Sequence, residues 1–309
     1  MQNINLFKNY ILRENLNKYT FFNYLIKNYT TICTGGNAGC FIELPGLDIL
    51  RNVFEFICKN EIKYNVIGNG SNLLVSENGF DGVVISLKKI PQKLYCKNNY
   101  LFISANIEVS HLLEMCQKYG LSGLEFLNGI PGTIGGIVEM NAGAFDHSIA
   151  EMLKEIAIIN ENGELEKISS ENIHFNYRKI DFKRSNYIII EAVLKIKRES
   201  QKKVEDLCKK YLFTRSSKFL LDCHTFGSVF KNGDDYYAGE LLEKCGLKGY
   251  RIGDAQISEK HANFIINIGK ATSNDIYKLI KIMRVKVFKK FNIKLEPEVK
   301  FWGDFSDAD

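Results

Sequence analysis

The chain alternates between segments with apolar residues at helical spacing and short runs rich in β-branched residues. The longest helical pattern opens near residue 273, and its apolar stripe is made by Ile276, Leu279, Ile280, Met283 and Val287. Such a stripe is typical of a helix that packs on a core rather than of a cofactor site. The same spacing predicts further helices at residues 6–16, 48–60, 110–119, 200–212 and 238–245.

Strand patterns fill much of the remaining sequence. We predict strands at residues 40–44, 65–67, 83–87, 94–96, 101–105, 187–197, 227–231, 263–268 and 295–299. Residues 149–160 pass from a short helical stretch into another strand, and Asn162-Gly163 then predicts a hairpin. Asp48 and Ser110 stand where helix N-caps are expected. The polar segment 200–212 marks a domain boundary, so we predict an α+β chain with domains 1–200 and 201–309.

Glycine is concentrated in two places. Gly120–Ala144 holds seven of the 24 glycines in 25 residues, and Val66–Val75 carries Gly68-Asn69-Gly70-Ser71-Asn72 between two apolar runs. Glycine adopts positive φ without steric cost and lets the backbone approach a ligand closely. Successive glycine turns also direct N–H groups into a concavity that holds anions such as a diphosphate. The alternative for either segment is a tight connection between two elements.

Neither glycine segment matches a common nucleotide motif. A G-x-G-x-x-G fingerprint needs glycine three residues after Gly70, where Leu73 stands, and Gly269-Lys270 lacks the rest of a P-loop. The formal net charge is +5, and lysine is spread along the whole chain. This mild excess fits an anionic small substrate and is too diffuse to indicate nucleic-acid binding.

The distribution of cysteine and of apolar residues bears on where the protein works. Eight cysteines are scattered without a C-x-x-C pair, which gives no zinc or thioredoxin-like signal and fits a reducing compartment. The sequence shows no secretory leader pattern and no apolar run near the roughly 18 residues of a membrane span. We expect a cytoplasmic monomer that binds neither metal, membrane nor nucleic acid.

Seven segments occur in the order that one enzyme family shows. They are TGGNAG (34–39), GNGSNLLV (68–75), GLEFLNGIPGTIGGIVEMNAGA (123–144), YR (177–178), GSVFKN (227–232), GLKGYRIGDAQISEKHANFIIN (246–267) and LEPEVKFWG (295–303). Through this set the chain resembles the UDP-N-acetylenolpyruvoylglucosamine reductase (MurB) family, in its shorter type that lacks an extra substrate-covering insertion. Each segment alone is weak, whereas the ordered set spans almost the whole chain.

The resemblance implies a fold and a cofactor. The fold would be an FAD-binding unit of the vanillyl-alcohol-oxidase (PCMH) class, with two α+β subdomains divided near residue 90, followed by a smaller α+β substrate domain. FAD would bind noncovalently, with its diphosphate on the two glycine segments. The cofactor-binding positions carried over are Gly68, Asn69, Gly70, Ser71, Asn72, Leu73, Gly129, Ile130, Pro131, Gly132, Gly135, Gly136, Asn141, Ala142 and Gly143.

The resemblance also implies a reaction. NADPH would reduce the flavin and leave, and UDP-N-acetylglucosamine enolpyruvate would then take hydride from flavin N5 to give UDP-N-acetylmuramate. The product is a peptidoglycan precursor, which connects the enzyme to cell-wall biogenesis, cell shape and cell division. Hydride addition places negative charge on the neighbouring carbon and its carboxylate, so the site needs fixed positive or donor groups and a proton donor there.

By the family match, Ser228 is the proton donor, and Arg178 and Glu298 flank the enolate. Arginine offers a planar, permanently charged fork that suits a carboxylate. Glu298 must be protonated to stabilise the enolate by donation, and burial favours that form. A strand at 295–299 would direct Glu298 to the face opposite Val299. On sequence alone, the plainer interpretations are a turn serine, a surface arginine and a solvent-facing carboxylate.

The match also places Lys218 and Asn232 at the substrate diphosphate and His261 in the same pocket. A lone histidine is more often a structural group, and Arg251 could equally reach the substrate or pair with Asp254.

Two departures from the family pattern affect the loops around Ser228. The usual K-Q-P-L segment is Lys218-Phe219-Leu220-Leu221 here, and Gly233 stands where a proline often follows lysine–asparagine.

Two other functions remain open from the sequence. The main alternative is a related noncovalent-FAD oxidase of an alcohol or sugar. Many such oxidases attach FAD covalently through a histidine near the first glycine segment. Here no histidine precedes His111, so a covalent link at residues 68–72 is not available, which weakens this alternative. A third hypothesis is a nucleotide-sugar-binding protein without flavin, which Ser228 disfavours because binding alone needs no proton donor.

Overall fold

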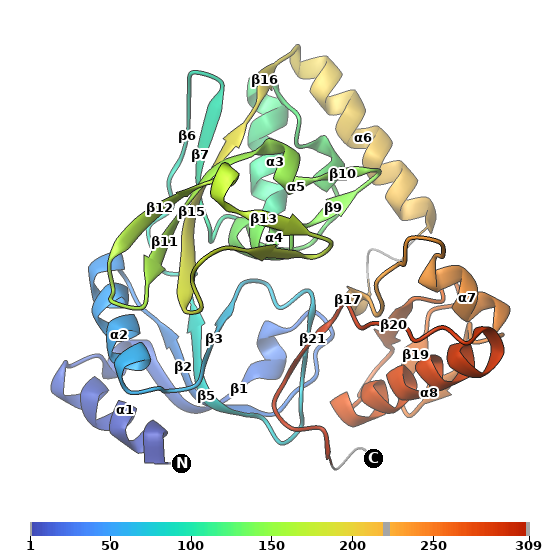
Figure 1. The fold of residues 1–309 in the computed structure, drawn as a ribbon, viewed down its shortest axis with the longest axis horizontal. Helices are drawn as coiled ribbons and strands as arrows, with labels where there is room; N and C mark the ends of the chain where they lie inside the picture. The colour runs from blue at the N-terminus through green and yellow to red at the C-terminus, as the bar shows by residue number, and fades with distance from the viewer. Residues whose placement is uncertain (1, 219–222, 307–309) are drawn as a thin grey trace. The chain divides into compact units, whose positions relative to one another are not determined.

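The computed structural model describes residues 2–218 and 223–306 and divides the chain into two compact units (Figure 1). Unit 1 consists of Met1–Phe21, Cys40–Gly68 and Gly82–Arg215, and unit 2 of Phe22–Gly39, Asn69–Asp81 and Ser216–Asp309. Segments Phe22–Gly39 and Asn69–Asp81 belong to unit 2 because their side chains Ile32 and Leu74 are buried in its core. These units are discontinuous in sequence, unlike the domains 1–200 and 201–309, which stay a prediction.

The chain crosses between the two units five times, and three of the crossings lie inside strands of one sheet. The sheet has the order β1-β2-β5-β3, with β1 at Thr20–Leu25, β2 at Asn37–Glu43, β5 at Phe80–Ser86 and β3 at Tyr64–Ile67. Strands β3 and β5 are parallel. The glycine turn at residues 68–72 follows directly on the carboxyl end of β3.

A five-stranded antiparallel sheet forms the centre of unit 1. Its order is β12-β11-β15-β7-β6, with β6 at Leu94–Lys97, β7 at Tyr100–Ser104, β11 at Leu153–Asn160, β12 at Leu165–Ser169 and β15 at Tyr187–Lys195. The predicted hairpin between β11 and β12 is confirmed. Gly163 has φ +72°, and the Asn160 side-chain oxygen accepts the N–H groups of Asn162 and Glu164, each at 3.0 Å.

Helices make up much of the rest of unit 1. They are α1 (Gln2–Arg13), α2 (Leu47–Lys59), α3 (Val109–Tyr119), α4 (Ile134–Glu139), α5 (Ile149–Met152) and α6 (Gln201–Lys218). Helix α4 packs against β15 and β7.

The predicted N-caps are wrong, because Asp48 and Ser110 lie inside the first turns of α2 and α3. There Asp48 accepts from Arg51 at 3.4 Å, and Ser110 donates to the carboxylate of Glu108 at 3.5 Å.

Three short ribbons complete unit 1. They pair β8 (Leu121–Ser122) with β16 (Lys197–Arg198), β9 (Gly143–Ala144) with β10 (His147–Ser148), and β13 (His174–Asn176) with β14 (Lys179–Asp181). The strand predicted at 187–197 is therefore two strands, because the chain leaves the central sheet after β15 and pairs again with β8.

Unit 2 contains a second antiparallel sheet of order β17-β20-β19-β18. The strands of this sheet are β17 (His224–Ser228), β18 (Arg251–Ile252), β19 (Ala255–Ile257) and β20 (Phe264–Asn267). Unit 2 also contains the helices α7 (Ala238–Lys244) and α8 (Ser273–Phe291), and the parallel strand pair β4 (Leu73–Val75) and β21 (Lys300–Trp302). Helix α8 packs against β18, β19 and α7 (Figure 1). All five residues of its predicted apolar stripe are at most 2% exposed, and a capping box of Thr272 and Asp275 opens the helix.

Two predicted strands of unit 2 are misplaced. The segment 227–231 is only the end of β17, which begins at His224, and residues 295–299 are irregular apart from a single bridge between Phe230 and Pro297. Proline has no N–H to donate to a ladder, so pairing stops at that bridge and the terminal strand begins at Lys300.

Candidate active site

The first glycine turn, residues 68–72, is held by contacts that leave no room for a side chain at Gly68 or Gly70. Gly70 has φ +59°, and a Cβ there would lie 2.0 Å from the carbonyl oxygen of Tyr29. Its own carbonyl accepts the N–H of Thr31 at 3.3 Å. Within unit 1, a Cβ on Gly68 would lie 2.5 Å from Oγ1 of Thr133. Gly68 therefore lies directly against the second glycine segment, residues 129–143.

Asn72 connects the first glycine turn to Glu298 inside unit 2. The side-chain amide of Asn72 donates to the carbonyl of Glu298 at 3.1 Å, and the N–H of Lys300 donates to the carbonyl of Asn72 at 3.1 Å. The N–H of Glu298 in turn donates to the carbonyl of Val229 at 2.8 Å. Glu298, which is half-buried, is thereby placed next to the residue that follows Ser228.

Ser228 is the last residue of β17, and the pairing with β20 is irregular just before it. Thr225 pairs with Ile266, and the next pair is Ser228 with Phe264. Gly227 has φ +80°, and a Cβ there would meet no atom within 4 Å, so the backbone conformation rather than crowding requires glycine. An irregularity of this kind changes the direction of a side chain, and it sets the position of the half-buried Ser228.

The middle of the second glycine segment packs against the turn that follows β7. The N–H of Gly135 donates to the carbonyl of Ala105 at 2.8 Å, and a Cβ on Gly135 would lie 3.0 Å from Cβ of Ala105. Gly136 differs, because it is exposed and a Cβ there would have only Thr133 Oγ1, at 3.8 Å, within 4 Å. Packing within the described residues explains Gly135 and does not explain Gly136.

The end of the same segment has a structural role. The side-chain amide of Asn141 donates to the carbonyl of Asn176 at 3.0 Å, and its oxygen accepts the N–H of Ala150 at 3.3 Å. A Cβ on Gly143 would lie 2.3 Å from the carbonyl oxygen of His147 across the β9–β10 ribbon. These contacts fix the segment whether or not a ligand is bound.

Arg178 lies in the turn between β13 and β14, with φ +59°. Its Nη2 donates to the carbonyl of Gly143 at 3.3 Å, and its guanidinium lies 4.7 Å from the ring centroid of Tyr177. Unit 1 therefore brings Arg178 to the end of the second glycine segment, as unit 2 brings Ser228 and Glu298 beside the first glycine turn.

Comparison with known proteins agrees with this arrangement over nearly the full chain. Residues 219–302 match the model of the UDP-N-acetylenolpyruvoylglucosamine reductase C-terminal domain, and residues 42–169 match an FAD binding domain. The reductase of that name from Clostridium novyi is 35% identical, over 92% of this chain and 92% of that protein. The one from Anoxybacillus flavithermus is 38% identical, over 89% and 92%. The chain belongs to the UDP-N-acetylenolpyruvoylglucosamine reductase family.

The crystal structure of the MurB reductase from Thermus caldophilus shares the fold. It has a TM-score of 0.77 at 30% identity and covers 92% of this chain and 98% of that one. The family resemblance seen in the seven sequence segments is confirmed. So is the fold class, an FAD-binding unit combined with a MurB C-terminal domain, both of mixed α and β structure.

In this MurB-family chain, the predicted substrate-binding residues lie around the ends of two helices. Lys218 is the last residue of α6, and the departure at Phe219-Leu220-Leu221 lies outside the described residues. The Asn232 side-chain oxygen accepts the N–H of Ala238 at 3.0 Å, where α7 begins. His261 contacts the same helix, since a Cβ on Gly239 would lie 2.8 Å from its Cε1. Asn232 and His261 thus meet at the start of α7.

Arg251, for which two interpretations were equal, forms a local ion pair. Its Nη2 lies 3.2 Å from Oδ1 of Asp254 and also donates to the carbonyl of Gly253. Both side chains are largely exposed, so the pair contributes little to stability.

The second glycine segment fits an anionic cofactor such as FAD. Several of its N–H groups are already bonded, those of Ile130, Ile134 and Gly135 to backbone carbonyls. Gly132 and Thr133 differ, since their N–H groups have no acceptor among the described residues. Together with the open position at Gly136, these N–H groups form the part of the segment that can receive a diphosphate.

Sequence analysis did not identify Arg215, which the structure places beside this segment. Its Nε donates to the carbonyl of Asn128 at 2.9 Å, and burial together with the Arg178 charge lowers the pKa of Arg215 to about 10. Helix α6 is polar and carries five lysines, so an arginine within it is expected to be solvated. Only the tertiary contact of α6 with Asn128 distinguishes Arg215 from its neighbours.

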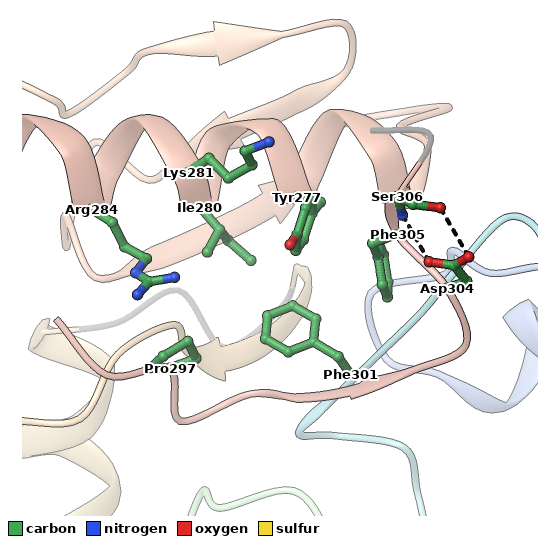
Figure 2. Close-up of a pocket in the computed structure, with 9 residues that line it drawn as sticks. All are labelled: Tyr277, Ile280, Lys281, Arg284, Pro297, Phe301, Asp304, Phe305 and Ser306. Atoms are coloured by element: carbon green, nitrogen blue, oxygen red, sulfur yellow. Dashed lines mark hydrogen bonds between the residues drawn. The ribbon is translucent and has the colours of Figure 1, made fainter. Parts of the chain in front are cut away.

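A separate hollow in unit 2 contains none of the predicted site residues (Figure 2). It measures about 350 Å³ and is lined by Tyr277, Ile280, Lys281, Arg284, Pro297, Phe301, Asp304, Phe305 and Ser306. The rings of Tyr277 and Phe305 stack with centroids 4.8 Å apart, and the carboxylate of Asp304 accepts two hydrogen bonds from Ser306 at 2.9 Å. The stacked rings fasten the C-terminal segment to α8, and the hydrogen bonds between Ser306 and Asp304 shape that segment.

Two further features concern the whole described chain. Among residues 2–218 and 223–306, no helix has both the length and the apolar character needed to cross a membrane. The same residues contain no group of three or more His, Cys, Asp or Glu side chains placed to hold a metal ion.

Proposed function

We propose that this chain is a UDP-N-acetylmuramate dehydrogenase, an NADPH-dependent flavoprotein that reduces UDP-N-acetylglucosamine enolpyruvate in peptidoglycan precursor synthesis. The observation that carries the proposal is the arrangement of unit 2. There, the side-chain amide of Asn72 joins the first glycine turn to the carbonyl of Glu298, and a backbone hydrogen bond joins Glu298 to Val229, the residue after Ser228. A cofactor-binding turn next to a proton donor and a carboxyl group suits reduction of a polarised double bond.

Bound FAD supplies the hydride chemistry, and the protein supplies binding, orientation and charge. In the proposed mechanism, Arg178 binds the enolpyruvyl carboxylate and stabilises the negative charge that develops there. Its Nη2 bond to Gly143 and its contact with the Tyr177 ring hold the guanidinium in one orientation. A preoriented cation of this kind requires no rearrangement as the charge forms.

Ser228 and Glu298 act at the carbon that becomes negatively charged. Ser228 donates its hydroxyl proton to that carbon, and Glu298 in its protonated form donates a hydrogen bond to the enolate oxygen. A serine hydroxyl is a weak acid, so the transfer depends on nearby positive charge or on a water molecule. Lys218 and Asn232 are proposed to bind the substrate diphosphate, with His261 lining the same pocket.

The wider setting follows the family. We propose that the enzyme acts in the cytoplasm as a monomer, with NADPH and the enolpyruvyl sugar nucleotide as its partners and with no nucleic acid or membrane. Through peptidoglycan supply, it would serve cell-wall biogenesis, cell shape and cell division.

An anaerobic absorbance experiment tests the proposal directly. The purified protein is expected to be yellow, to lose its flavin absorbance on addition of NADPH, and to regain it only with UDP-N-acetylglucosamine enolpyruvate. Rapid recovery with oxygen alone would instead indicate an oxidase of an alcohol or sugar. A colourless protein that takes up no FAD would contradict the assignment of the glycine segments.

A further inference from the structure

We infer that Arg215 is a second cationic ligand of the substrate's enolpyruvyl carboxylate, next to Arg178. This inference rests on the proposed function and adds to it a residue that lies outside the seven segments of the family resemblance. It begins from the position of the guanidinium in unit 1. Nε of Arg215 donates to the carbonyl of Asn128 at 2.9 Å, and Cδ lies 2.6 Å from where a Cβ of Gly129 would be. The side chain therefore lies directly on the start of the second glycine segment.

One end of this guanidinium lacks a partner. Nη2 of Arg215 is buried and has no hydrogen-bond acceptor among the described residues. A buried charged donor without an acceptor is costly. The fold retains the group nevertheless, which indicates that an acceptor arrives with a ligand.

The charge that acts electrostatically on this guanidinium has the same sign. Arg178 interacts electrostatically with Arg215 and, after burial, is the second cause of its lowered pKa. Both guanidiniums contact one ribbon: Arg178 donates to the carbonyl of Gly143, and Arg215 lies 5.4 Å from the ring centroid of Phe145. Two adjacent cations repel each other unless an anion lies between them. A carboxylate has two oxygens and can accept from both guanidiniums at once.

The carboxylate is favoured over the phosphates of the ligands because of what Arg178 does in the proposed mechanism. Arg178 flanks the group on which charge develops, and Arg215 contacts the same β9–β10 ribbon as Arg178. A second guanidinium there would stabilise the increase in negative charge during hydride addition. The competing interpretation is structural, with Arg215 serving only to hold Asn128 and Gly129 in place.

Three ligands separate these interpretations. They are UDP-N-acetylglucosamine enolpyruvate, UDP-N-acetylglucosamine, which has the same diphosphate and no carboxylate, and NADPH. Binding of the two sugar nucleotides is followed by the absorbance change of the oxidised holoenzyme, without turnover. For NADPH, the rate of anaerobic flavin reduction is measured. Arg215→Met is compared with wild type, with Arg184→Met as the matched control at an exposed arginine paired to Glu166.

For Arg215→Met we expect the Kd of the enolpyruvyl nucleotide to rise by about 30-fold or more, as for loss of one partner of a buried charge pair. In the same variant, the Kd of UDP-N-acetylglucosamine and the rate of flavin reduction by NADPH should each change by less than about twofold. The control Arg184→Met should leave both Kd values and the reduction rate unchanged. An equal loss for both sugar nucleotides would assign Arg215 to the diphosphate and overturn the inference. A loss confined to NADPH would overturn it as well.

A second variant keeps the test decisive if Arg215→Met loses FAD or does not fold. Arg215→Lys retains the aliphatic stem and the charge and removes the planar fork, so it should weaken the enolpyruvyl nucleotide selectively by about tenfold. If Arg215→Lys binds all three ligands as tightly as wild type does, the inference is overturned, and Arg215 has only the structural role of holding Asn128 and Gly129 in place. If wild-type flavin is not reoxidised by the enolpyruvyl nucleotide, the proposed function itself fails, and this inference fails with it.

Discussion

The two glycine segments differ in what makes glycine necessary. In the first glycine turn, atoms of the protein occupy the space that a Cβ would need, with Tyr29 O 2.0 Å from that position at Gly70 and Thr133 Oγ1 2.5 Å from it at Gly68. In the second glycine segment, Gly136 is helical and exposed and has nothing nearer than 3.8 Å. The first turn is part of the frame of the fold, whereas the second segment keeps one face open.

This difference indicates that the first glycine turn has mainly a structural role and that the open part of the second glycine segment has mainly a cofactor-binding role. The first glycine turn is bonded through Asn72 to Glu298, and its residues 69–72 lie in the same unit as Ser228. Substitutions within that turn should therefore disturb the fold, while substitutions of the side chains it positions should disturb only the chemistry. The open part of the second segment should affect cofactor affinity and leave the fold intact.

The largest effect is expected for Ser228→Ala, which removes the proposed proton donor without touching the turn. We predict that NADPH still reduces the flavin at the wild-type rate, while reoxidation by the enolpyruvyl nucleotide slows by roughly 10²–10⁴-fold. Stopped-flow absorbance measures both half-reactions, with Ser110→Ala, an exposed hydroxyl, as the control. Equal slowing of the two half-reactions would refute the role of Ser228 as proton donor.

Glu298→Gln is expected to have the next largest effect. The amide preserves the shape of the side chain and the backbone bonds to Asn72 and Val229 and removes the acidic proton. Turnover should fall by about 10²-fold, with the Kd of the enolpyruvyl nucleotide nearly unchanged. Glu296→Gln is the matched control, because Glu296 is exposed and pairs only with Lys231. Unchanged turnover in Glu298→Gln would remove this residue from the mechanism.

Gly70→Ala tests whether the first glycine turn belongs to the frame of the fold. The new Cβ would require positive φ and would collide with the carbonyl of Tyr29, so we expect the free energy of unfolding to fall by about 3 kcal/mol. Urea unfolding of the FAD-free protein measures it. Gly46→Ala is the control, since a Cβ there meets no atom within 4 Å. A wild-type urea midpoint for Gly70→Ala would show that the turn adapts, and the contrast between the two segments would disappear.

Gly136→Ala tests the opposite expectation for the second segment. Alanine is a better helix former than glycine, so stability should stay constant or rise by up to about 1 kcal/mol. FAD affinity should fall by roughly tenfold, because the methyl group occupies space that the cofactor approaches. Fluorescence titration of the FAD-free protein with FAD gives the Kd. Undiminished affinity would mean that the cofactor does not contact Gly136.

Local patterns predicted much of the fold, and tertiary contacts account for the failures. The stripe from Ile276 to Val287 and the Asn162-Gly163 hairpin depend on residues close in sequence, and both predictions are confirmed. The strand expected at 295–299 failed because its pairing depends on Phe230, far away in the chain, and ends at Pro297.

The candidate site divides in the same way. The seven family segments supplied Arg178, Ser228 and Glu298, whose roles stay predictions. Arg215 lies in a polar helix where nothing in the sequence distinguishes it from solvated neighbours, and only its burial against Asn128 does so.

The smallest effect concerns the support of the second glycine segment by α5. His147 hydrogen-bonds Glu151 at 2.9 Å and thereby lowers the pKa of Glu151. A carboxyl group whose pKa is lower in the folded state stabilises the fold above its unfolded pKa, and that contribution is lost as the pH falls through the folded value. Because Glu151 is exposed, Glu151→Gln should cost only about 0.3 kcal/mol at pH 7 and nothing near pH 3.

Urea unfolding of both proteins across this pH range measures the difference, with Glu171→Gln, at a looser exposed pair with Lys154, as the control. FAD affinity should be the same in wild type and Glu151→Gln, because the Asn141 bonds to Asn176 and Ala150 remain in place. A loss of FAD affinity in this variant would show that the end of the second segment is held less firmly than those bonds indicate. In that case the open face would extend beyond Gly136 to Gly143, and the two glycine segments would differ less than their contacts suggest.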